Sequence, residues 1–334
     1  MGAMLTQGNL LANLEQMSKV PALREAESDV VLLALPLFHI YALNVVLGIT
    51  IREGATAILV ERFDPVSTLE LIERRRITVL FGAPPMFAAW LEAAGEQPPD
   101  LSSVRIAVSG AAPLPGEVLE AFRERFGITI WEGYGLTETA PAVTTNALGD
   151  EAKRDSIGLA LPGVEVRLVD DRGEDVAEGD PGEILVRGPN VFRGYWRRPD
   201  DTELSFRDGW LRTGDVAYRD EDGYLFIVDR TKDLVIVSGF NVYPKEVEEA
   251  IAGHPKVAEV VVIGVPDDRT GEAVKALIVP GKGESPTEEE ILDHCRVTLA
   301  RFKWPRHIEF VEALPKHVTG KVLRRALREP EASP

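Results

Sequence analysis

The first 155 residues alternate short apolar runs with amphipathic segments. The runs are four to six residues long and rich in Val, Ile and Leu, as in buried parallel strands, and they cover residues 30–35, 55–60, 78–81, 105–108 and 128–131. Residues 66–75 and 116–126 carry apolar positions at helical spacing. Strands that alternate with helices predict βαβ units, and therefore an α/β fold with a doubly wound parallel sheet.

The pattern changes near residue 156, where short alternating segments are separated by turns. Predicted strands at residues 164–169, 183–187 and 224–228 indicate a small β-barrel-like subdomain, and residues 210–215 are typical of a turn. Further along, an α+β pattern predicts strands at 234–237, 258–265, 273–279 and 307–311 and helices at 244–252 and 287–299. We expect three parts: a partial α/β subdomain (1–155), a β-rich subdomain completing the large domain (156–231), and a mobile α+β C-terminal domain (232–334).

Residues 30–51 need a test for membrane insertion, because they are mostly apolar and about as long as a bilayer span. Pro36, His39 and Asn44 fall near the middle of this stretch, where each would be costly in lipid. A buried strand, a loop at 36–39 and an apolar helix fit better. We expect no transmembrane segment.

Composition narrows the class of protein. The formal net charge of −17 argues against general nucleic-acid binding and against docking on an anionic membrane. A single cysteine, Cys295, excludes an internal disulfide and fits a reducing compartment, and its apolar surroundings predict a core position. The first residues lack the features of a signal peptide. We expect a cytoplasmic protein.

The strongest local motif is Gly-Tyr-Gly-Leu-Thr-Glu-Thr at residues 133–139, directly after a predicted strand. Glycines allow close approach of a ligand, and Tyr134 offers a ring face for stacking on a base. The Thr137 hydroxyl and the Glu138 carboxylate suit a phosphate oxygen and Mg²⁺. A tight strand-to-helix turn with a capping Thr explains the same residues in isolation.

Two further positions suit a nucleotide. Asp215 could accept hydrogen bonds from the vicinal hydroxyls of a ribose, although alone it also fits an ordinary Asx-turn. Lys321 follows a glycine near the chain end, where an ammonium could neutralise a transferring phosphate, although a lone Lys at a turn is usually surface decoration.

Together, in this order and spacing, these motifs resemble the superfamily of adenylate-forming enzymes, which includes acyl-CoA synthetases, non-ribosomal adenylation domains and luciferase-like enzymes. The resemblance covers essentially the whole chain. It extends to segments 109–113 (Ser-Gly-Ala-Ala-Pro), 182–189, 194–196 (Gly-Tyr-Trp), 229–233 (Asp-Arg-Thr-Lys-Asp) and 239–244. Segments 229–244 and 316–325 look most like those of long-chain fatty-acid and aryl-CoA ligases.

The resemblance implies a role for each matching residue. Tyr134 would stack on adenine, with Gly135 in the same nucleotide-binding turn, and Gly110, Ala111 and Ala112 would line the adenine slot.

The same resemblance implies that Thr137 contacts the α-phosphate and that Glu138 holds Mg²⁺. Asp215 and Arg230 would bind the ribose, and Lys321 would be the adenylation lysine, bridging carboxylate and phosphate oxygens.

Three positions follow by resemblance on the acyl and CoA side. Lys232 would be the hinge about which the C-terminal domain rotates between half-reactions, and Gly239 would border the pantetheine tunnel. His39 would lie near the acyl substrate, or else be a satisfied core histidine.

The implied enzyme is an acid–thiol ligase that uses ATP, Mg²⁺ and coenzyme A. It converts a carboxylic acid, on this resemblance a fatty acid, to an acyl-adenylate and then to acyl-CoA, releasing pyrophosphate and AMP. An acyl-AMP ligase that delivers to a carrier protein stays open, and a homo-oligomer is compatible with the sequence.

The sequence departs from the superfamily at its start. The Ser/Thr/Gly-rich phosphate loop of the superfamily ends in Pro-Lys-Gly, and Met1 stands in the place of that Lys. We therefore expect a fragment, a split reading frame or a degenerate copy. A non-catalytic remnant that binds adenylate or CoA, or that complements another chain supplying the loop, is the alternative function.

Overall fold

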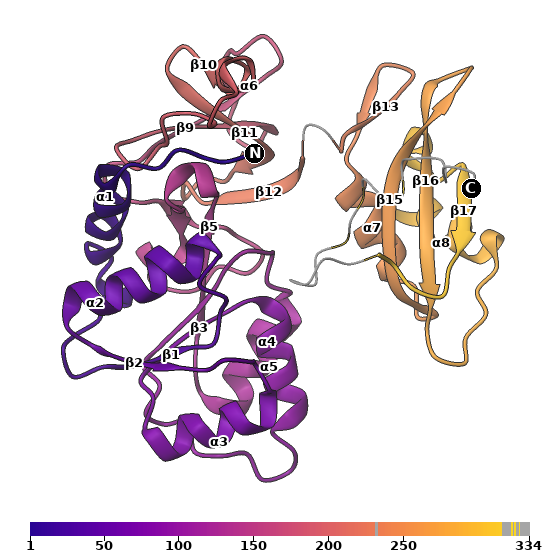
Figure 1. Cartoon of the computed structure of the whole chain (residues 1–334). Helices are drawn as coiled ribbons and strands as arrows, with labels where there is room; N and C mark the ends of the chain where they lie inside the picture. Colours follow the sequence, from indigo (N-terminus) through magenta and orange to yellow (C-terminus); the bar gives the residue numbers. More distant parts are fainter. Residues whose placement is uncertain (231–232, 316–321, 323, 325–326, 328–334) are drawn as a thin grey trace. The chain divides into compact units, whose positions relative to one another are not determined.

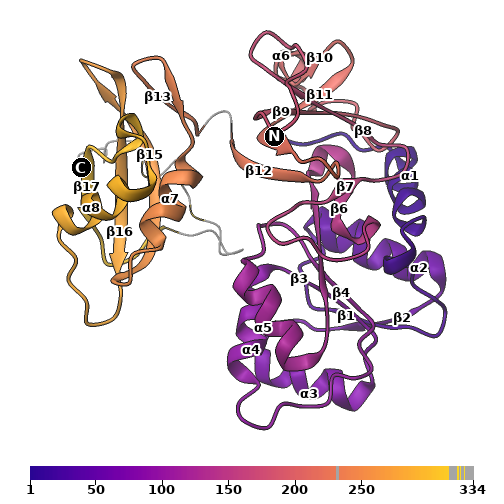
Figure 2. The ribbon, with the colours of Figure 1, turned by 180° about the vertical axis from the view of Figure 1, so that it is seen from behind.

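The computed structural model describes residues 1–230, 233–315, 322, 324 and 327. These divide into two compact units (Figures 1 and 2). The first comprises Met1–Thr213 and Ala217–Ile227, and the second comprises Gly214–Val216 and Val228–Pro334. The three-part division expected from the sequence stays a prediction.

The first unit contains a seven-stranded sheet in the order β2-β1-β3-β4-β5-β6-β7. Its strands are β1 (Val30–Leu33), β2 (Thr56–Leu59), β3 (Val79–Gly82), β4 (Ile106–Ser109), β5 (Ile130–Gly135), β6 (Ala142–Thr145) and β7 (Leu159–Ala160). The pairs among β1 to β5 are parallel, whereas β6 and β7 add antiparallel pairs. The predicted α/β class with a mostly parallel sheet is confirmed.

Helices cover both faces of this sheet (Figure 1). Leu32 belongs to a core with α3 (Pro65–Arg75), α4 (Pro84–Ala93) and α5 (Gly116–Phe126). Its neighbours Val31 and Leu33 belong to a second core, shared with α1 (Gln7–Ser18), the π-helix η2 (Tyr41–Gly48) and α2 (Ile49–Glu53). Successive strand residues point to opposite faces, so an uninterrupted apolar run serves both cores.

The apolar stretch from residue 30 to residue 51 is a strand, a loop and a helix. Asn44 is buried inside η2, where its amide donates to Ala140 O at 2.7 Å and Leu10 O at 3.2 Å. The polar residue that would be costly in lipid therefore ties η2 to the β5–β6 connection and to α1. Among the helices of the described residues, none is long and apolar enough to cross a bilayer.

A second sheet has the order β10-β11-β9-β8, with β12 also paired to β11. Its strands are β8 (Glu165–Val169), β9 (Gly182–Arg187), β10 (Phe206–Arg207), β11 (Trp210–Arg219) and β12 (Leu225–Arg230). The turn expected at 210–215 is wrong, because these residues lie in β11. Strand pairing overrides the local turn preference, and Gly214 keeps a positive φ of 71° inside the strand.

Shorter elements of the first unit are η1 (Pro21–Leu23), η3 (Thr137–Thr139), η4 (Asn146–Leu148) and α6 (Pro199–Leu204).

The second unit has its own sheet, β14-β13-β16-β15, with β17 parallel to β16. The strands are β13 (Val235–Val237), β14 (Phe240–Val242), β15 (Val257–Asp267), β16 (Gly271–Pro280) and β17 (His307–Phe310); the helices are α7 (Pro244–Ala252), α8 (Glu288–Thr298) and η5 (Arg301–Lys303). Cys295 is fully buried in the core of this unit, as predicted, and burial raises the pKa of its thiol to about 11.

Candidate functional site

Four neighbouring parallel strands of the first unit end at the same edge of the sheet. The connections that follow β1, β3, β4 and β5 contain His39, Ala83, the segment Gly110 to Ala112, and the turn at Thr137. Ser109 pairs with Glu132, so Gly110 and Gly133 continue side by side beyond this pair. Ligands of open α/β sheets bind outside the carboxyl ends of strands, so this edge is the candidate site of the first unit.

The loop after β4 is held by the side chains of Glu132 and Tyr41, to which the sequence analysis assigned no role. Ala111 has a left-handed backbone with φ of 71°. The Leu114 amide donates to the buried Glu132 carboxylate at 3.2 Å, which fastens the loop to β5. The Tyr41 hydroxyl donates to Val108 O at 3.2 Å, and burial raises its pKa far above the usual range. The segment Gly110 to Ala112, which was predicted to line the adenine slot, is thus held in place by side-chain hydrogen bonds.

The turn after β5 is fastened through Thr139 and Asn190, both fully buried. Thr139 Oγ1 accepts from Leu136 N at 3.0 Å and also donates to carbonyl oxygens of the turn. The Asn190 amide donates to Thr139 O at 2.8 Å. This fixed turn leaves Thr137 exposed and Glu138 half-buried.

Tyr195 is the direct partner of Glu138. Its hydroxyl donates to Glu138 Oε1 at 2.7 Å, and burial together with this bond raises the pKa of Tyr195 to about 12. Tyr195 also pairs with Ala3, so the start of the chain runs beside it. An open surface depression of about 480 Å³ adjoins this contact; its lining residues are Met4, Tyr195, Arg197, Arg198, Pro199, Thr202 and Glu203.

His39 lies in the loop between β1 and η2, at the same sheet edge. Its Nδ1 accepts from Tyr41 N at 3.2 Å, and partial burial lowers its pKa, so the ring is neutral at pH 7. This local partner fits a satisfied histidine, while its place at the edge fits a neighbour of the acyl group.

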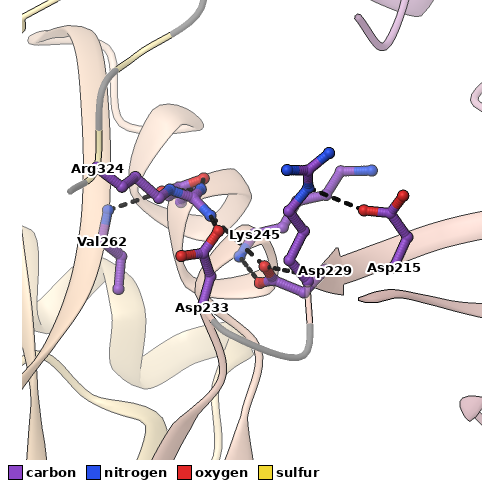
Figure 3. Close-up of polar contacts among 8 residues, drawn as sticks. Asp215, Asp229, Asp233, Lys245, Val262 and Arg324 are labelled. Atoms are coloured by element: carbon purple, nitrogen blue, oxygen red, sulfur yellow. Dashed lines mark hydrogen bonds and ion pairs between the residues drawn. The ribbon is translucent and has the colours of Figure 1, made fainter. Parts of the chain in front are cut away.

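In the second unit, Asp215 and Arg230 lie together. Arg230 Nε is 2.8 Å from Asp215 Oδ1, and the Asp215 side chain is 4% exposed whereas that of Arg230 is 38% exposed (Figure 3). The cation therefore holds the carboxylate in one orientation and keeps its own outer edge accessible. The two residues predicted to share one role are brought into contact.

Gly239 occupies a two-residue hairpin between β13 and β14. Ser238 and Gly239 have φ of 52° and 83°, the left-handed pair of a type I′ turn. Both residues are exposed at the tip. Lys232 and Lys321, the predicted hinge and adenylation lysine, lie outside the described residues.

Across the part of the chain that the structure describes, no group of three His, Cys, Asp or Glu side chains could hold a metal ion. Mg²⁺ commonly binds through one or two carboxylates together with substrate phosphates. Glu138, half-buried and hydrogen-bonded by a neutral tyrosine, fits that mode of binding.

Sequence reasoning assigned no role to Tyr195, which holds Glu138, or to Glu132, which holds the loop after β4. Tyr195 stood in a recognised segment, Gly-Tyr-Trp, but its partner lies 57 positions away in the sequence. A long-range contact of this kind leaves no local pattern in the sequence. The Gly-Tyr-Trp segment was therefore the one available signal that Tyr195 has a role.

Comparisons with known proteins agree with this geometry. Residues 2–196 match the AMP-binding enzyme family, and residues 246–321 match the AMP-binding enzyme C-terminal domain. Over 332 residues, 99% of the chain, it is 46% identical to a long-chain-fatty-acid–CoA ligase of Yersinia pestis. Over 328 residues it is 42% identical to a feruloyl-CoA synthase of Amycolatopsis sp.

Solved structures give the same relationship. ATP-bound MatB from Rhodopseudomonas palustris matches 98% of this chain with a TM-score of 0.90 and 38% identity. The o-succinylbenzoate CoA synthetase MenE from Bacillus subtilis, in complex with an acyl-adenylate intermediate, matches with a TM-score of 0.87 and 33% identity. The chain spans 59% of the Yersinia ligase and 64% of MatB. On this evidence the chain belongs to the AMP-binding enzyme family, within the adenylate-forming superfamily.

Proposed function

We propose that this chain carries the nucleotide-binding and C-terminal portions of an acid–thiol ligase. The reaction is ATP-dependent conversion of a carboxylic acid to an acyl-adenylate and then to acyl-CoA. The observation that carries the proposal is similarity over 98% of the chain to ATP-bound MatB, combined with the candidate residues at one sheet edge. A fatty acid is the proposed substrate, because ligases of long-chain fatty acids are among its relatives at 41–46% identity.

The roles proposed for the first unit are those that the resemblance implies. Tyr134 stacks on adenine beside the Gly110 to Ala112 loop, Thr137 donates to the α-phosphate, and Glu138 holds Mg²⁺ with the phosphates. The cation supplies charge neutralisation, and Tyr195 orients the carboxylate that holds it.

The roles in the second unit are binding of ribose hydroxyls by Asp215 and Arg230 and neutralisation of the reacting oxygens by Lys321. Lys232 serves as the hinge between the half-reactions, and Gly239 borders the pantetheine path. In the first unit, His39 borders the acyl group. No protein nucleophile is needed, because the carboxylate attacks the α-phosphorus and expels pyrophosphate. The CoA thiol then attacks the acyl carbon and displaces AMP.

Turnover with ATP, Mg²⁺ and a panel of acids tests the proposal. We expect pyrophosphate release that depends on the acid, acyl-CoA once CoA is added, and loss of most release in Lys321→Ala, since a charge at the reacting phosphate is removed. Acyl-AMP that accumulates with CoA present, but is consumed by a carrier protein, would favour the acyl-AMP ligase. Equal turnover in Lys321→Ala would disprove the assigned role of Lys321.

A second candidate function is a chain that works only with another polypeptide supplying the phosphate loop. Large apolar side chains are exposed on the neighbouring elements α1, η2, α2 and β2: Leu11 at 62%, Leu43 at 46%, Ile51 at 70% and Leu59 at 65%. Exposed apolar side chains on adjoining elements favour a protein contact. Calorimetric binding of AMP or CoA with no turnover by the chain alone would support this candidate. Strong turnover by the chain alone would rule it out.

A further inference from the structure

The guanidinium of Arg324 meets three carboxylates in the second unit (Figure 3). Its Nη2 donates to both oxygens of Glu248, each at 2.6 Å. Its Nη1 lies 3.5 Å from Asp229 Oδ1 and 3.6 Å from Asp233 Oδ2. Glu248 lies in α7, Asp229 in β12 and Asp233 in the connection before β13. A single side chain, that of Arg324, therefore contacts two elements and the connection between β12 and β13.

We call these three acids the acidic socket, and two of them are fixed independently of Arg324. Asp229 accepts from the Arg230 and Lys245 amides at 2.7 and 2.9 Å, and Glu248 accepts from the Val262 amide at 2.7 Å. Backbone donors therefore set the positions of two of the three carboxylates, and a bidentate cation fits the result.

The carboxylates of the acidic socket are largely buried, so their negative charges require a nearby cation. The exposed fractions of the Asp229, Asp233 and Glu248 side chains are 2%, 10% and 16%. Burial raises the pKa of Asp229 and of Glu248, and the charge of Arg324 opposes that rise in both. Buried carboxylates that lose their cation are strongly unfavourable, so Arg324 is held tightly.

The sequence positions give this contact a consequence for catalysis. Arg324 comes three residues after Lys321, and Asp229 and Asp233 stand on either side of Arg230 and Lys232. We infer that Arg324 is a positioning residue, which binds the acidic socket and thereby fixes the segment bearing Lys321 to the residues that flank the hinge. The inference rests on the proposed function. It predicts that adenylation, which needs Lys321 in place, suffers more than thioester formation when Arg324 is lost.

Hydrogen–deuterium exchange on the full 334-residue chain tests the contact between Arg324 and the acidic socket, and it needs no turnover. Arg324→Ala should speed exchange in peptides covering residues 316–327 by about tenfold or more, since local opening becomes easier. Arg324→Lys, a point charge without the planar fork, should restore part of the protection. Glu248→Gln removes one charge of the acidic socket but keeps an oxygen that can accept from the Val262 amide. This second variant tests the contact if Arg324→Ala does not fold. Arg296→Ala, which breaks an exposed ion pair with Asp293, is the matched control.

The catalytic half of the inference is tested by the two half-reactions measured separately. Pyrophosphate release should fall about tenfold or more in Arg324→Ala, whereas acyl-CoA formation from supplied acyl-adenylate should fall much less. Unchanged exchange in both Arg324→Ala and Glu248→Gln, or an equal fall in both half-reactions, would overturn it. A wild-type chain without turnover would count against the proposed function. The exchange data would still show whether Arg324 holds its segment through the acidic socket.

Discussion

The hydroxyl of Tyr195 reaches the one carboxylate that we assign to Mg²⁺. A hydrogen bond to a charged group contributes about 1.5–3 kcal/mol, so Tyr195→Phe should lower acid-dependent pyrophosphate release on the order of tenfold. Tyr218→Phe, in which the ring keeps its stacking on Phe226, is the control. Release assays at saturating ATP and at several Mg²⁺ concentrations measure the effect. Equal release in wild type and Tyr195→Phe would show that this bond does not position Glu138.

Glu25 is a second residue whose surroundings make a prediction. It is 3% exposed, and its oxygens accept no hydrogen bond from the residues that the structure describes; the nearby Thr50 hydroxyl donates to Val46 O instead. Burial, reinforced by Asp29, raises the pKa of Glu25 to about 8 from a usual 4.5. The folded chain therefore binds a proton that the unfolded chain releases between these two values.

Stability should accordingly fall as pH rises from about 4.5 through about 8. Glu25→Gln removes the ionisable group and should be more stable than wild type at pH 9 by at most about 5 kcal/mol, since the pKa of Glu25 rises from 4.5 to about 8 and one pKa unit corresponds to about 1.4 kcal/mol. Urea unfolding at pH 5 and pH 9 measures this difference. A difference in stability between Glu25→Gln and wild type that is the same at both pH values would contradict the assignment.

At the scale of elements, the β5–β6 connection determines where Thr137 and Glu138 lie. A Cβ added at Gly135 would come within 2.1 Å of Pro141 O, which is backbone and cannot swing away, whereas one at Gly133 would meet Thr144 O at 3.2 Å. Gly135→Ala should therefore cost about 1–3 kcal/mol and displace the turn, and Gly133→Ala should cost less. Thermal unfolding and AMP titration compare the two variants. A Gly135→Ala chain with wild-type stability and affinity would refute this account.

At the scale of the whole molecule, each unit has its own hydrophobic core. Val247, Ile251, Ile291 and Cys295 belong to a cluster made of residues from the second unit alone. A fragment of residues 228–334 should therefore fold by itself and unfold cooperatively in urea, since its core needs no residue of the first unit. Circular dichroism and fluorescence, which should give coincident transitions, measure this. A fragment without a cooperative transition would show that the domain boundary lies elsewhere.

Much of the fold follows from local patterns. The helices at residues 116–126 and 244–252 begin and end where their periodicity predicts, because Gly127 in the left-handed region ends the first and Pro244 starts the second. The apolar runs likewise mark β1 to β4 within a residue or two. The region around Asp215 was misjudged, because strand pairing prevails over turn preference there.

The sequence by itself determined the fold class and the superfamily, because hydrophobic periodicity and motifs with fixed spacing are local and survive in the order of residues. Tertiary structure alone decided which groups hold those motifs in place. Tyr195 reaches Glu138 across 57 positions, and Arg324 reaches Asp229 across 95. Such contacts depend on how sheets and helices pack, so no window along the chain contains them.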